Sequence, residues 1–68
     1  MEVQQTYIVK TKIVFEALNY NLPVSYPAYC VLFECEKNHW YVKWNDHIER
    51  ISPEAAIHIR CICQQIMS

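Results

Sequence analysis

Apolar and polar positions alternate in the segment TYIVKTKIVFEA, near the start of the chain. Alternation with a period of two is typical of a strand that buries one face, so the pattern predicts a strand over about residues 5–16. Its later part, TKIVFEALNY, also fits a helix, and that alternative stays open. The apolar side of the strand would carry Tyr7, Val9, Ile13 and Phe15, and the helix would use Ile13, Val14, Ala17 and Leu18.

Residues 19–29, NYNLPVSYPAY, have no hydrophobic period. Two prolines and two asparagines in this stretch indicate a loop. It is long for a connection between strands, and loops of this length often carry function.

The segment YCVLFECEKNHWYVKWND, residues 29–46, is predicted to form a β-hairpin. A tip at Lys37 and Asn38, or a four-residue loop from Glu36 to His39, gives the same strand pairing. A slip of one residue would exchange the two faces of the hairpin, so the separation of apolar and polar residues is expected to fix the pairing. The apolar face would pair Cys35 with Trp40, Phe33 with Val42 and Val31 with Trp44, and the other face Glu36 with His39, Glu34 with Tyr41 and Leu32 with Lys43.

The last third of the chain is predicted to form an amphipathic helix over about residues 53–66. Ser52 is a favourable N-cap, Pro53 suits the first helical position, and Glu54 adds a favourable charge to the first turn. The stretch IHIRCIC also alternates, and its isoleucines favour strands, but the start signal decides for a helix. The apolar side of the helix would carry Ala55, Ala56, Ile59, Ile62, Cys63 and Ile66.

Together these elements predict an α+β fold in one compact domain over residues 1–68: a small three-stranded antiparallel sheet with a C-terminal amphipathic helix packed on one face. The expected core side of the sheet consists of Tyr7, Val9, Ile13, Phe15, Val31, Phe33, Trp40, Val42 and Trp44.

Composition removes several classes of function. The chain has no glycine, so it lacks the phosphate loop, the dinucleotide fingerprint and the nucleophile elbow, and its turns must use Asn, Asp, Pro or Ser. The net charge of −1 argues against nucleic acid as a partner. No apolar run approaches the roughly 18–20 residues of a membrane span. No secretory signal is visible, so we expect a cytoplasmic protein with reduced thiols.

The cysteines and histidines do not form a recognisable chemical site. Structural zinc sites use closely spaced pairs whose side chains converge, whereas Cys30 and Cys35 would face opposite sides of a strand. We therefore expect no metal and no cofactor, and a packing contact between Cys35 and Cys63 across the core. His39 and His47 lie beside carboxylates, but such surface pairs are ordinary, so we expect no enzymatic activity.

The motif WYVKW, residues 40–44, resembles the central strand of chromodomains, whose pattern is similar to Y-L-V-K-W-K-G. The resemblance implies a three-stranded sheet with a C-terminal helix, and an aromatic cage for methyl-lysine in which Trp44 would be the matching residue. It covers five of the 68 residues, and the family's following glycine is Asn45 here. A core hairpin strand remains the favoured interpretation of this motif.

The solvent face of the sheet is the candidate functional surface. It is expected to present the apolar residues Ile8, Val14, Leu32 and Tyr41 among charged ones. Such a face with no second helix over it is unusual in a monomer and favours a protein partner, or alternatively a second copy of the chain. The expected function is a small non-enzymatic inhibitor, adaptor or accessory protein, of the kind that phages and mobile elements often encode. The alternative is a nucleic-acid-binding or chromodomain-like peptide-binding module. The predicted contact residues are Ile8, Lys10, Lys12, Leu32, Glu34, Tyr41 and Lys43.

Overall fold

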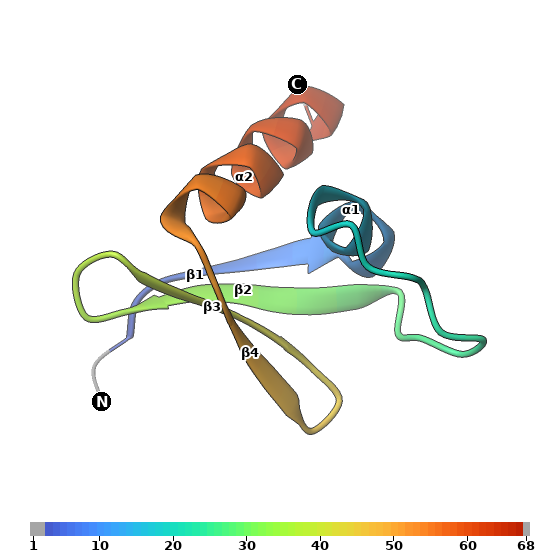
Figure 1. Ribbon diagram of the computed structural model, residues 1–68. Helices are drawn as coiled ribbons and strands as arrows, with labels where there is room; N and C mark the ends of the chain where they lie inside the picture. Colours follow the sequence, from blue (N-terminus) through green and yellow to red (C-terminus); the bar gives the residue numbers. More distant parts are fainter. Residues whose placement is uncertain (1–2, 68) are drawn as a thin grey trace.

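The computed structural model describes residues 3–67, with side chains for residues 3–63. One antiparallel sheet has the strand order β1-β2-β3-β4, and both helices lie on the same side of it (Figure 1). The prediction of an α+β fold with an antiparallel sheet and a C-terminal helix is confirmed, but the sheet has four strands rather than three. The elements are β1 (Val3–Lys10), α1 (Thr11–Ala17), β2 (Tyr29–Cys35), β3 (His39–Trp44), β4 (His47–Ile51) and α2 (Pro53–Met67).

The fourth strand, β4, follows a two-residue turn at Asn45 and Asp46. Trp44 pairs with His47 across this turn, and Asn45 takes the left-handed conformation, with φ of 52°. The strand HIERI is hard to recognise in sequence because polar residues occur on both of its faces. Only Ile51 is buried, whereas Ile48 is exposed.

The predicted first strand is too long, because the chain turns into a helix after Lys10. Thr11, Val14 and Phe15 are buried along one side of α1, and their spacing is that of a helix face. The helical alternative for TKIVFEALNY is therefore confirmed in this part. No side chain caps the helix at Lys10, so its start carries no sequence signal. The backbone N–H of Thr11 donates to the carbonyl of Ala28, at 3.1 Å, which ties the end of the long loop to the start of α1.

The predicted hairpin register is wrong by one residue. Three residues, Glu36–Asn38, connect β2 to β3, so that Cys35 pairs with His39 and Leu32 with Val42. A loop of two or four residues pairs Cys35 with Trp40 or Glu36 with His39, as predicted. A loop of three residues pairs Cys35 with His39, which shifts the pairing by one residue. The side chains of β2 therefore exchange faces relative to those of β3. Leu32 now joins the core side, whereas Val31 and Phe33 lie on the opposite side.

The physical reason is that β2 is a central strand with apolar residues on both faces. Leu32 is fully buried and Phe33, its neighbour in sequence, is only 9% exposed. Strands buried on both faces appear as continuous apolar runs, as YCVLF does here. The contrast between apolar and polar residues that was expected to set the register does not exist in this strand.

The core lies between the sheet and the two helices. Trp40 and Val42 are buried there as predicted, and Trp44 packs at its edge. At the start of α2, the Ser52 hydroxyl accepts a hydrogen bond from the N–H of Ala55, at 3.1 Å, so the predicted cap and helix are confirmed. Ile66 lies outside the described side chains. The buried core residues are Val9, Val14, Phe15, Cys30, Leu32, Trp40, Val42, Ile51, Ala56 and Ile59.

In this chain without glycine, asparagine occupies most of the turn positions that need a left-handed backbone. Within residues 3–67, four non-glycine residues have positive φ: Asn19 at 60°, Glu36 at 56°, Asn38 at 69° and Asn45 at 52°. Asparagine tolerates this left-handed region better than most residues. The expectation that the turns use residues such as asparagine is confirmed at three of these positions.

Candidate functional site

The side of the sheet away from the helices, here called the open face, is covered by no helix of the described chain (Figure 1). The strand pairing assigns its residues, because neighbours across strands share a face. One row crosses the sheet as Ile8, Val31, Lys43 and Ile48, and the next as Thr6, Phe33, Tyr41 and Arg50.

Only part of the predicted contact set lies on this open face. Ile8, Tyr41 and Lys43 are there. Lys10 ends β1 at the margin of this face, where it pairs with Tyr29 of β2. Leu32 is fully buried in the core, so its predicted exposure is wrong. The other two predicted residues also lie elsewhere: Glu34 is on the helix side and Lys12 is on α1.

The open face is more apolar than predicted. Ile8 is 67% exposed, Tyr29 57% and Ile48 54%. The rings of Phe33 and Tyr41 stack at its centre, with centroids 5.5 Å apart and planes inclined by 20°. Sequence reasoning missed Tyr29, Val31, Phe33, Ile48 and Arg50. The continuous run YCVLF was the available signal for the three residues on β2, because a strand apolar on both faces must present one of them away from the helices.

Charges are separated between the two sides of the sheet. Lys43 and Arg50 lie on the open face, both exposed. The strand carboxylates Glu34 and Glu49 lie on the helix side, since they pair with Trp40 and Val42 of the core face. Among the described strand residues, the open face therefore carries positive side chains and no carboxylate.

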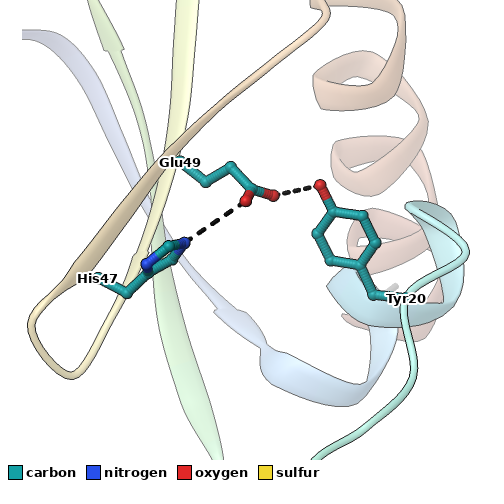
Figure 2. Close-up of polar contacts among 3 residues, drawn as sticks. All are labelled: Tyr20, His47 and Glu49. Atoms are coloured by element: carbon teal, nitrogen blue, oxygen red, sulfur yellow. Dashed lines mark hydrogen bonds and ion pairs between the residues drawn. The ribbon is translucent and has the colours of Figure 1, made fainter.

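A second polar group joins β4 to the loop after α1 (Figure 2). The Tyr20 hydroxyl donates to one oxygen of Glu49, and Nε2 of His47 lies 3.4 Å from the other oxygen. The hydrogen bond to Glu49, together with burial and the negative charge, raises the pKa of Tyr20. Because these contacts join the loop after α1 to β4, we interpret the three side chains as a tether that holds the loop against the sheet.

The thiols do not meet as predicted. Cys35 lies on the open face while Cys63 belongs to α2 on the other side, so the expected contact between them is wrong. Cys63 instead acts on Cys30, whose pKa it raises slightly through its charge. Burial raises the pKa of both thiols, and Lys10 partly opposes this effect at Cys63. In the described part of the chain, no group of three His, Cys, Asp or Glu side chains is placed to hold a metal ion.

Tyr7, Trp40 and Trp44 contact groups of the same chain. The Arg60 guanidinium carbon lies 4.8 Å from the ring centre of Tyr7 and 5.6 Å from that of Trp40. Trp44, the residue matched by the chromodomain resemblance, packs against Phe15 at 5.0 Å and His47 at 4.7 Å between centroids. The cation over Tyr7 and Trp40 is therefore the protein's own arginine.

No helix of the described residues has the length and apolar character needed to cross a membrane. No protein-family model, no curated protein and no solved structure matches this chain.

Proposed function

We propose that this protein is a small non-enzymatic module that binds another protein through the open face of its sheet. The observation that carries the proposal is the exposure of Ile8, Tyr29 and Ile48 around the stacked pair of Phe33 and Tyr41. Apolar groups of this kind lose contact with water in a complex, and aromatic residues are enriched at such interfaces. An inhibitor, an adaptor and an accessory subunit all act in this way.

The arrangement of the other polar groups supports binding over catalysis. The Tyr20, His47 and Glu49 cluster links a loop to an edge strand. Its groups are exposed or half-buried, whereas catalytic groups are usually held in a cleft that shifts their pKa values for the task. The open face, by contrast, offers contact area and a fixed pattern of side chains.

The test is to place a charge on the open face and measure both folding and capture of a partner. Ile8→Glu and Ile48→Glu are the test variants, and Ile57→Glu on α2 is the matched control, because Ile57 is 56% exposed. Exposed substitutions shift stability by only about 0.5 kcal/mol. A charge buried in the interface should weaken binding by about 10-fold or more.

The measurement is affinity capture from cell extract with quantitative mass spectrometry, beside thermal melting of each variant. We expect the proteins retained by the parent chain to be lost with Ile8→Glu and Ile48→Glu and kept with Ile57→Glu. Equal retention by all three folded variants would remove the open face as the binding surface.

A further inference from the structure

We propose, resting on the function proposed above, that the open face selects a protein partner whose contact surface is acidic, with carboxylates placed around apolar side chains. The net charge of −1 hides the local distribution of charge from which this follows. The strands direct Lys43 and Arg50 to the open face and Glu34 and Glu49 to the helix side.

Each cation on the open face lies beside an apolar residue. Lys43 pairs with Val31 on one side and Ile48 on the other, and Arg50 pairs with Tyr41, which stacks on Phe33. A partner that covers these apolar groups must therefore also cover the cations. Removing a cation from water is costly unless an opposite charge compensates it.

The chain itself does not supply that compensation in the part described. The ion pairs found there are His39 with Glu36 and His47 with Glu49, and neither involves Lys43 or Arg50. We infer that the carboxylates that neutralise these two side chains in a complex come from the partner. An arginine in this position also favours carboxylates geometrically, because its planar fork donates two parallel hydrogen bonds.

A second copy of the chain fits this face less well. A symmetric dimer buries the same patch on both subunits, which would bring the positive side chains of one copy against those of the other. Nucleic acid also fits less well. Of the rings on this face, Tyr29 is exposed at one margin, whereas Phe33 at the centre is only 9% exposed. Lys43 and Arg50, with Lys10 at the margin, would neutralise few phosphates.

The experiment compares synthetic peptides that share the same spaced leucine and tyrosine residues and differ only in the intervening positions, which are all Glu, all Ser or all Lys. Binding to the intact protein is measured by fluorescence anisotropy at low and high salt, and amide chemical shifts locate the contact. We expect the Glu peptide to bind at the open face at least about 10-fold more tightly than the Ser peptide, and the Lys peptide not to bind. Added salt should reduce the difference.

Charge-reversal variants connect this preference to individual residues. Lys43→Glu and Arg50→Glu should each abolish the preference for the Glu peptide, whereas Lys12→Glu, the same change on α1, should leave it intact. Equal binding of the Glu and Ser peptides, or no binding of either, would overturn the acidic selection. Loss of capture with Ile8→Glu would then still stand as support for the proposed function.

Two further measurements compare the other classes of partner. Oligothymidylate is titrated in the same assay, and the protein alone is followed by sedimentation. Tighter binding of oligothymidylate than of the Glu peptide would assign the face to nucleic acid. A dimer that Tyr41→Glu dissociates would assign it to a second copy. We expect neither result.

Discussion

Leu32 and Ile8 are large aliphatic residues on neighbouring strands, yet one is fully buried and the other is 67% exposed. We expect Leu32→Ala to lower the free energy of unfolding by about 2–5 kcal/mol, because it leaves a cavity beneath the helices. Ile8→Ala should change it by only about 0.5 kcal/mol. Urea unfolding of both variants gives the comparison, and similar midpoints would contradict the register that places Leu32 in the core.

Residue environments could be read from the sequence only where polar neighbours mark one face. On β3, Lys43 and the half-buried Tyr41 alternate with buried Trp40 and Val42, and all four were assigned to the correct face. On β2 the run YCVLF gives no such contrast, so Leu32 was misplaced. Ile48 and Arg50 were missed because their strand was not recognised.

At the scale of elements, the β2–β3 loop depends on Asn38, whose φ of 69° lies in the left-handed region. We expect Asn38→Gly to preserve stability and Asn38→Val to cost roughly 1–2 kcal/mol, because a β-branched residue is unfavourable there. Lys37→Val is the control, since Lys37 does not have positive φ. Thermal unfolding measures all three variants. Full tolerance of valine at position 38 would argue against a loop of three residues.

Helix α2 was predicted because Ser52, Pro53 and Glu54 are residues typical of a helix start. The predicted cap at Ser52 is present. Helix α1 has no equivalent signal, since Lys10 precedes it without a side-chain cap. Tertiary burial of Val14 and Phe15 decides its conformation instead. Local sequence thus specified the helix with a marked boundary and left the other ambiguous with a strand.

At the scale of the whole molecule, the proposed binding surface exists because both helices lie on one side of a four-stranded sheet (Figure 1). The sequence correctly suggested an uncovered face and three of its members, Ile8, Tyr41 and Lys43. The rest depended on strand number and pairing, which arise from contacts between segments. The segregation of Lys43 and Arg50 from Glu34 and Glu49 emerges only from that pairing.

The strand order of the sheet, which repeats the order along the chain, also has a kinetic consequence. Short turns join β2 to β3 and β3 to β4, whereas residues 11–28 separate β1 from β2. Closing the longer loop costs more entropy and delays the contacts it brings. We therefore expect the transition state for folding to contain the three-strand meander, with β1 joining later.

Two matched valines test this order, because Val42 on β3 and Val9 on β1 are both buried. Val42→Ala should mainly slow folding, while Val9→Ala should mainly accelerate unfolding. Stopped-flow chevron plots separate the two rates. A larger effect on the folding rate from Val9→Ala would mean that the amino-terminal strand docks before the meander is complete.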